Sequence, residues 1–214
     1  HVERPAAGAP IGALVFFHGY GGAPEEWLAF LDKLDPDRRF HGYLPEAPRL
    51  DRDGNRSWFP RGSLDPPETQ VAPAVEWLDG LPYRRQQTVI GGWSQGTNLA
   101  YALALGPEHE RPAGLVALAG GFRDELPPDL ERPLPPVLIA HGRFDDAVPV
   151  RVARHARDLL ERAHASLEPM LQPYSDAPTM RGLPQHTDAG LDSLVDAADA
   201  AGLQVILHAI GDAA

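Results

Sequence analysis

The sequence predicts an α/β protein in which a mostly parallel sheet carries helices on both faces, with an atypical C-terminal part. Short apolar runs of strand length alternate with helical patterns, and three of these runs end in glycine-containing turns that carry serine, histidine or aspartate. Strands that alternate with helices form parallel sheets covered on both sides. Ligands bind such sheets at the carboxyl ends of the strands, where these three turns are expected.

The predicted elements follow one another with short connections, as the many prolines and glycines indicate. In the first half they are a strand over 13–17, a helix opened by Pro24, a strand over 40–44, a loop over 45–64, a helix over 69–81, a strand over 87–90 and a helix over 97–105. In the second half they are a strand over 114–119, a loop over 127–136, a strand over 137–140, a helix over 150–163, a strand over 166–171, a loop over 172–185, a helix over 191–201 and a strand over 203–209. We expect a core over 1–168, which the segment 169–214 completes or extends within the same domain.

The composition narrows the range of functions. With a formal net charge of −11, the chain repels phosphate backbones and anionic lipid head groups, so we expect neither a nucleic-acid nor a membrane partner. The absence of cysteine excludes a disulfide framework, a cysteine nucleophile and thiolate zinc sites. No apolar run approaches the ~18 residues of a spanning helix, and no targeting segment follows His1, so we expect a cytoplasmic protein.

Gly92-Trp93-Ser94-Gln95-Gly96 matches the nucleophile elbow G-x-S-x-G, between an apolar strand and an apolar helix. Such a turn holds the serine in a strained conformation, lifts its oxygen above the sheet and aims the next amide, that of Gln95, at a developing oxyanion. The alternative is an ordinary glycine-rich turn with a capping serine.

His18-Gly19-Tyr20-Gly21-Gly22 follows the strand over 13–17 and provides a second candidate for oxyanion binding. A glycine-rich turn directs backbone amides into the cleft, and the N–H of Tyr20 is the natural donor. We interpret His18 itself as a packed structural histidine. The alternative is again a plain tight turn.

His141-Gly142-Arg143-Phe144-Asp145 ends another strand and supplies the carboxylate that a catalytic triad requires to orient its base. Asp145 and Asp146 are adjacent, so only one of them can point correctly. The alternative is an acidic cluster at the N-terminus of the next helix, where the helix dipole favours negative charge.

Residues 14–22, Arg56-Ser57-Trp58-Phe59 and the two turns around Ser94 and Asp145 together resemble the carboxylesterase/phospholipase family of α/β-hydrolases, which includes acyl-protein thioesterases. The resemblance covers about residues 11–168. It implies Ser94 as the nucleophile, Asp145 as the acid, the amides of Tyr20 and Gln95 as the oxyanion hole, and no cofactor. The implied activity is hydrolysis of carboxylic esters with short- to medium-chain acyl groups through an acyl-enzyme.

The family's Gly-His pair, which carries the base, is missing, and residues 172–214 instead resemble a fragment of a YtcJ-like amidohydrolase. That family is a metal-dependent barrel, in which His208 would match a strand-end ligand. The other ligands are absent, so we expect no metal site. The chain therefore resembles a chimera of two hydrolases.

The base must come from a histidine that follows Asp145 in the chain. His186 follows a predicted strand and loop and precedes a helix, the position at which the family places its base. His208 is an alternative if its strand joins the sheet in parallel. His155 and His164 belong to an outer helix and are interpreted as solvated, and a chain without a competent base remains an open alternative.

Trp58, Phe59 and Phe144 are the candidates for an apolar acyl pocket, although each can equally belong to the core. The main alternative to an esterase is an inactive scaffold that binds or self-assembles, with the apolar strand over 203–207 forming a homodimer at an exposed sheet edge. A metal-dependent amidohydrolase is the least favoured hypothesis, because only scattered histidines are present.

Overall fold

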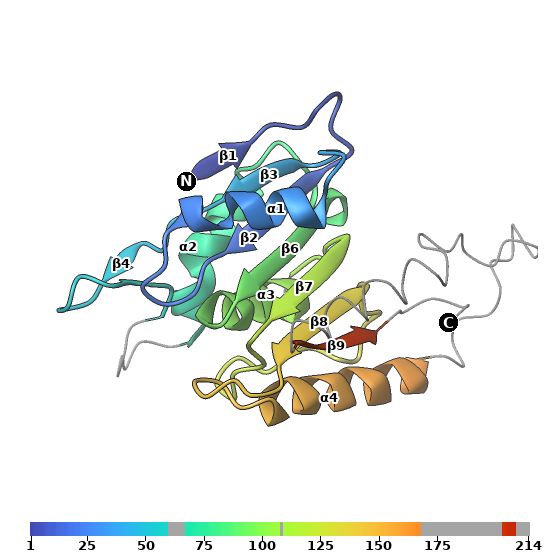
Figure 1. Ribbon diagram of the computed structural model, residues 1–214. Coiled ribbons are helices and arrows are strands. Elements are labelled where there is room, and N and C mark those ends of the chain that lie inside the picture. Colours follow the sequence, from blue (N-terminus) through green and yellow to red (C-terminus); the bar gives the residue numbers. More distant parts are fainter. Residues whose placement is uncertain (60–66, 108, 168–202, 209–214) are drawn as a thin grey trace, which may run out of the picture.

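The computed structural model describes residues 1–59, 67–107, 109–167 and 203–208. Its centre is a seven-stranded sheet of order β1-β3-β2-β6-β7-β8-β9 (Figure 1). The strands are β1 Val2–Arg4, β2 Ala13–Phe17, β3 His41–Leu44, β6 Thr88–Trp93, β7 Gly114–Leu118, β8 Val137–Gly142 and β9 Leu203–His208, with a separate hairpin of β4 Arg49–Leu50 and β5 Arg56–Ser57. The helices are η1 Pro24–Trp27, α1 Leu28–Leu34, α2 Pro67–Asp79, η2 Arg85–Gln87, α3 Gln95–Leu105 and α4 Arg151–Leu167.

The five central strands run parallel, and the two outer ones, β1 and β9, run antiparallel to their neighbours. Alternate residues of β2 serve opposite faces, as the period of a strand requires. Val15 and Phe17 pack with α2, α3 and α4, whereas Leu14 and Phe16 pack on the α1 side. The predicted α/β architecture with helices on both faces is therefore confirmed.

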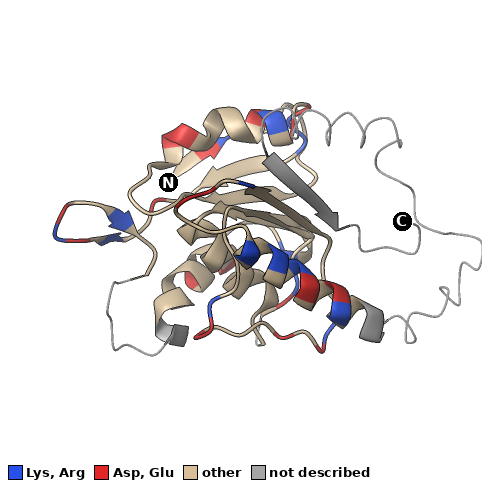
Figure 2. Ribbon diagram, turned by 60° about the horizontal axis from the view of Figure 1, so that its bottom comes forward, with Lys and Arg blue, Asp and Glu red and all other residues tan. Residues whose placement is uncertain are grey.

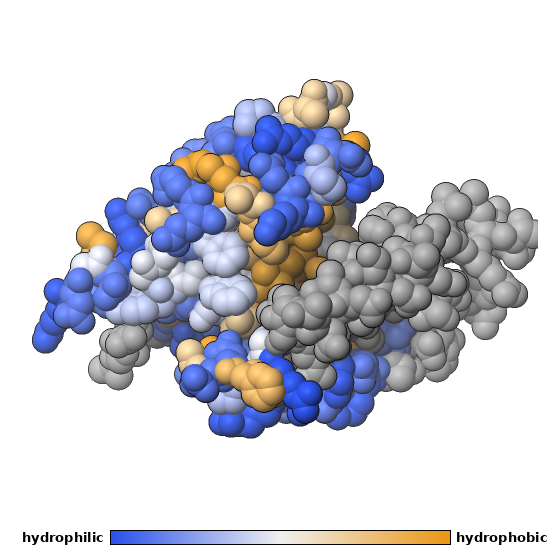
Figure 3. Space-filling view, viewed as in Figure 1, coloured by the Kyte–Doolittle hydropathy of each residue, from blue (hydrophilic) through white to orange (hydrophobic). Residues whose placement is uncertain are grey.

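On the α1 side, apolar side chains remain visible beside the helix (Figure 3). Val89, Leu138 and Ala140 are only partly buried there. The outer face of α4, by contrast, carries both signs of charge (Figure 2). Within the described ranges, no helix is long and apolar enough to cross a membrane.

A buried ion pair links the first strand, β1, to the connection that follows α1. Arg4 donates to the Oδ2 atom of Asp35 at 2.6 Å, and the two side chains are 3% and 4% exposed. Asp35 also accepts the backbone N–H groups of Arg39 and Phe40. Burial alone would raise the pKa of Asp35, but these donors outweigh it and hold the pKa below its usual value.

Two predictions of secondary structure were wrong. The expected strand over 166–171 begins inside α4, which extends to Leu167, and the rest of it lies outside the described residues. The expected loop over 45–64 contains the β4–β5 hairpin. The predicted helix over 191–201 also lies outside the described residues.

Candidate active site

Ser94 occupies a sharp turn between the end of β6 and the start of α3. Its backbone angles are φ 52° and ψ −114°, in a region that L-residues rarely adopt. A Cβ atom on Gly92 would lie 2.3 Å from the carbonyl carbon of Gly96, and one on Gly96 would lie 2.1 Å from the carbonyl oxygen of Phe17. The two flanking glycines are thus required by backbone contacts, and the predicted elbow geometry is present.

The side-chain hydroxyl of Thr97 stabilises this turn through contacts with the backbone. Its buried Oγ1 lies 2.6 Å from the carbonyl oxygen of Gly92 and 2.5 Å from that of Leu118, and it accepts the N–H of Leu118 at 3.1 Å. The N–H of Ser94 donates to the same Leu118 carbonyl at 2.9 Å. Sequence reasoning missed Thr97, because a threonine in the first turn of a helix is not distinctive.

The glycine-rich turn after β2 lies directly against Ser94. A Cβ atom on Gly19 would lie 3.5 Å from the Cβ of Ser94. His18 accepts the N–H of Ala47 through Nε2 at 3.0 Å and makes a 2.7 Å contact between Nδ1 and the carbonyl of Gly19, so Nδ1 carries the proton. Burial lowers the pKa of His18, which favours the neutral ring. Its bonding supports the structural role expected for it.

The two amides expected to form the oxyanion hole belong to neighbouring elements. Gln95 is the first residue of α3, so its N–H has no acceptor within its own helix. Tyr20 lies in the adjacent turn, and its hydroxyl donates to Asp51 of the β4–β5 connection. The next amide, that of Gly21, donates to the carbonyl of Arg56 at 2.8 Å, which attaches this turn to β5.

Asp145 follows β8 at the same sheet edge. Its Oδ1 accepts the N–H groups of Ala147 and Val148 at 2.9 and 2.8 Å, while Oδ2 lies 3.7 Å from Nε2 of the buried His141. β7 alone separates β6 from β8, so the two strands that lead to Ser94 and Asp145 lie about 10 Å apart. Asp146 is exposed. The fixed carboxylate of Asp145 suits it better to the role of the acid.

The histidines that follow Asp145 in the chain lie in different parts of the molecule. His155 is exposed on α4, and His164 lies near the end of the same helix, as expected for an outer helix. The parallel strand required for His208 is absent. β9 is antiparallel, and His208 pairs with Val137 at the amino end of β8, about 17 Å from the edge that holds the site. His186 lies outside the described residues.

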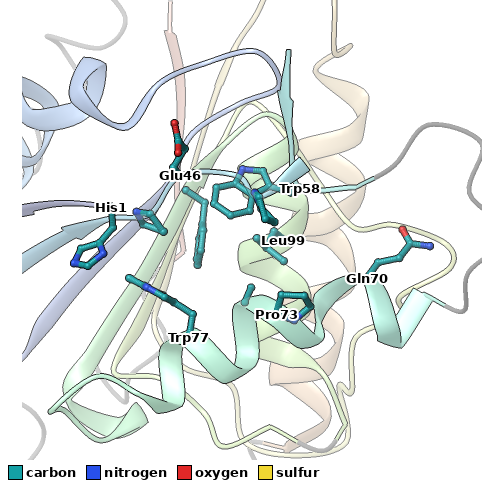
Figure 4. A pocket seen from close by; sticks show the side chains of 11 residues that line it. His1, Glu46, Trp58, Gln70, Pro73, Trp77 and Leu99 are labelled. Carbon is teal, nitrogen blue, oxygen red and sulfur yellow. The ribbon is translucent and has the colours of Figure 1, made fainter. Parts of the chain in front are cut away.

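The predicted aromatic residues separate into buried and exposed ones. Trp58 and Phe59 are 5% and 2% exposed, whereas Phe144 is 81% exposed and is not among the residues that line the cavity beside Trp58. Trp58 borders a cavity of about 320 Å³ that is also lined by His1, Glu46, Gln70, Trp77 and Leu99 but not by Ser94 (Figure 4). Trp93, next to Ser94 in the chain, is 39% exposed, and its ring centroid lies 5.6 Å from that of Trp27.

Within the described ranges, no cluster of three or more histidine and carboxylate side chains could hold a metal ion. The elbow, the glycine-rich turn and the carboxylate at one sheet edge instead correspond to the arrangement of a hydrolase. The model of the alpha/beta hydrolase family matches residues 14–212. The chain belongs to the alpha/beta hydrolase family.

Solved structures of this hydrolase's fold include several esterases. Esterase PE8 is 26% identical, with a TM-score of 0.61, over 75% of this chain and 82% of that one. A carboxylesterase of Bacillus cereus is 22% identical, with a TM-score of 0.63, over 76% and 79%. Acyl-protein thioesterase 2 of Zea mays is 18% identical, with a TM-score of 0.58, over 93% and 97%. No curated protein matches the sequence.

The resemblance of residues 172–214 to a YtcJ-like amidohydrolase finds no support. The match to the hydrolase family continues to residue 212, and β9 pairs with β8 of the same sheet. A chimeric C-terminus is therefore not needed to account for the final strand.

Proposed function

We propose that this chain is a serine hydrolase that cleaves carboxylic esters through an acyl-enzyme intermediate. The observation that carries the proposal is the strained conformation of Ser94 between two glycines that leave no room for a Cβ atom. A strained residue at the carboxyl edge of a parallel sheet and at the start of a helix is typical of a nucleophile. The esterases among its structural relatives support the same reaction class.

In the proposed mechanism a histidine removes the proton from the Ser94 hydroxyl as its oxygen attacks the ester carbonyl. The N–H groups of Tyr20 and Gln95 stabilise the resulting oxyanion. The tetrahedral intermediate collapses, the protonated base gives its proton to the leaving alcohol, and a water molecule then hydrolyses the acyl-enzyme. Asp145 orients the base and stabilises its protonated form.

We propose His186 as the base. The chain order of nucleophile, acid and histidine in this fold requires a residue after Asp145. β9 begins with Leu203 paired to Gly142, so the chain has returned to the edge that holds Ser94 by that point. His186 precedes Leu203 by 17 residues, and a chain of this length can connect it to this edge, since an extended chain spans about 3.4 Å per residue.

The substrate class proposed is an ester with a short- to medium-chain acyl group. The basis for this class is the resemblance of the sequence motifs to the carboxylesterase/phospholipase family. The cavity of about 320 Å³ beside Trp58 is lined by neither Ser94, Tyr20 nor Gln95, so its volume does not measure the acyl pocket. A series of p-nitrophenyl esters from acetate to palmitate measures this preference. We expect kcat/KM to fall beyond medium chain lengths, and an increase up to palmitate would contradict the proposed class.

The test of the mechanism is hydrolysis of p-nitrophenyl butyrate by the wild type, Ser94→Ala and His186→Ala, with His155→Ala as the matched histidine control. Loss of the nucleophile or base of such a unit lowers kcat by about 10⁴–10⁶-fold. We expect both variants to lose activity on this scale and His155→Ala to retain it. A fluorophosphonate probe should label the wild type at Ser94.

Two outcomes would overturn parts of this proposal. Full activity of His186→Ala would remove His186 from the mechanism. A folded wild type that neither hydrolyses esters nor reacts with the probe would favour an inactive scaffold.

A further inference from the structure

The segment after the β4–β5 hairpin contacts both elements that carry the expected oxyanion donors. The backbone N–H of Trp58 donates to the Oε1 atom of Gln95 at 2.9 Å, and the Nε2 atom of Gln95 donates to Ser57 Oγ at 3.2 Å. The indole Nε1 of the same tryptophan donates to the carbonyl of His18 at 2.7 Å. One residue, Trp58, is therefore bonded to the start of α3 and to the turn after β2.

We propose that Ser57, Trp58 and the side chain of Gln95, together called the brace, set the distance between the two halves of the oxyanion hole. They are positioning residues, because their side chains act through the backbone that carries the amides. The proposal rests on the proposed esterase function. It adds a task for the side chain of Gln95 beyond that of its amide.

The packing around Trp58 gives the brace its rigidity. Its ring centroid lies 5.1 Å from those of both Phe17 and His18, and its side chain is 5% exposed. The His18 carbonyl that accepts the indole proton is also the atom that would lie 2.6 Å from a Cβ on Gly96. The end of β2, the start of α3 and the indole ring therefore meet at one carbonyl group.

Such a contact matters because catalysis by fixed dipoles depends on their position. Oxyanion donors must lie within hydrogen-bond distance of the place where the charge develops. A displacement of 1 Å in a positioned group can lower the rate by about 100-fold. A loosened brace would let the two amides drift apart while the substrate still binds.

The test uses two variants. Trp58→Phe keeps an aromatic ring and removes the indole N–H donor, and Gln95→Met keeps the length of the side chain and removes its hydrogen bonds to Ser57 and Trp58. We expect kcat on p-nitrophenyl acetate to fall by about 10- to 100-fold, with KM changed less than twofold. The double variant should lose about as much as the worse single variant, because both disrupt one unit. Leu105→Val, a buried change at the far end of α3, is the control for general destabilisation and should retain kcat.

The competing explanation is that Trp58 acts only by lining the cavity that it borders. If that is its only role, Trp58→Phe will impair hydrolysis of the octanoate ester and leave that of the acetate ester intact, and the brace proposal is wrong. Equal losses on both esters support the brace. An effect on Leu105→Val as large as that on Trp58→Phe would also overturn it.

A readout independent of turnover separates this proposal from the proposed function. Hydrogen–deuterium exchange should show faster exchange in the peptides covering 18–22 and 94–98 for both brace variants. If the wild type proves inactive on esters, the proposed function fails, and this measurement still decides whether the brace holds the two elements. Unchanged exchange in both peptides would refute it.

Discussion

Substitution of Ser94 by glycine and by alanine measures the strain stored at the proposed nucleophile. Both variants remove the hydroxyl, but only alanine keeps a Cβ atom at φ 52° and ψ −114°. Backbone conformations of this kind cost about 1–3 kcal/mol for a residue with a side chain. Glycine loses about 0.5–1 kcal/mol to its greater freedom in the unfolded chain. We therefore expect Ser94→Gly to be more stable than Ser94→Ala by up to about 2 kcal/mol.

The assay is urea unfolding of both Ser94 variants, with the free energy of unfolding compared at equal slopes. Glu76, exposed in α2, supplies the control pair, because its φ is negative and glycine should there be the less stable variant by about 1 kcal/mol. The reversal of sign between the two positions is the expected result. A Ser94→Gly protein less stable than Ser94→Ala by as much as at Glu76 would refute the idea of a strained elbow.

Three further predictions concern the scaffold. Gly96→Ala should lower the free energy of unfolding by about 1–3 kcal/mol and reduce kcat, because the new Cβ atom would lie 2.1 Å from the last carbonyl oxygen of β2. Gly114→Ala is the control and should be tolerated, because its Cβ atom would have its nearest contact at 3.6 Å. Urea unfolding and ester hydrolysis compare the two variants. Asp35→Asn should cost about 3 kcal/mol at pH 7, because it removes the buried carboxylate that pairs with Arg4 at 2.6 Å and leaves the 3.3 Å contact with Asp32 as the remaining ion pair of that guanidinium. Because the folded pKa of Asp35 is lowered, its contribution is present above about pH 4 and lost as the pH falls further, so acid titrations of stability should flatten in this variant. Because the folded pKa of His18 is lowered, its contribution to the free energy of unfolding is fully present above about pH 6.5 and declines below that pH. His18→Gln should weaken this decline in unfolding curves measured from about pH 8 to 5.

The sequence was sufficient for elements whose signal is local. The strand over 13–17 has the predicted bounds, because five consecutive apolar residues followed by glycines leave few alternatives. The elbow could also be predicted from the sequence. A Cβ atom on Gly92 or Gly96 would clash with backbone atoms, so both positions require glycine, and this requirement appears as a motif in the sequence. These are features for which local composition and tertiary structure agree.

Features that depend on distant partners could not be read in the same way. The direction of β9 is decided by its pairing with β8, and an apolar run fits a parallel or an antiparallel neighbour equally well. The β4–β5 hairpin is only two residues on each side, and contacts with the turn around Gly21 stabilise it. Gln95 was expected to contribute its amide, but the bonds of its side chain to Ser57 and Trp58 cross 38 and 37 positions of sequence.

The position of Trp93 has a practical consequence. Its indole is partly open to solvent, precedes the proposed nucleophile directly and packs against a second indole, that of Trp27. Intrinsic fluorescence from this pair should respond to a ligand that binds beside Trp93, because indole emission shifts with its surroundings. The protein thereby carries its own optical reporter, with which the proposed acylation of Ser94 can be followed in real time without a chromogenic ester or an attached dye.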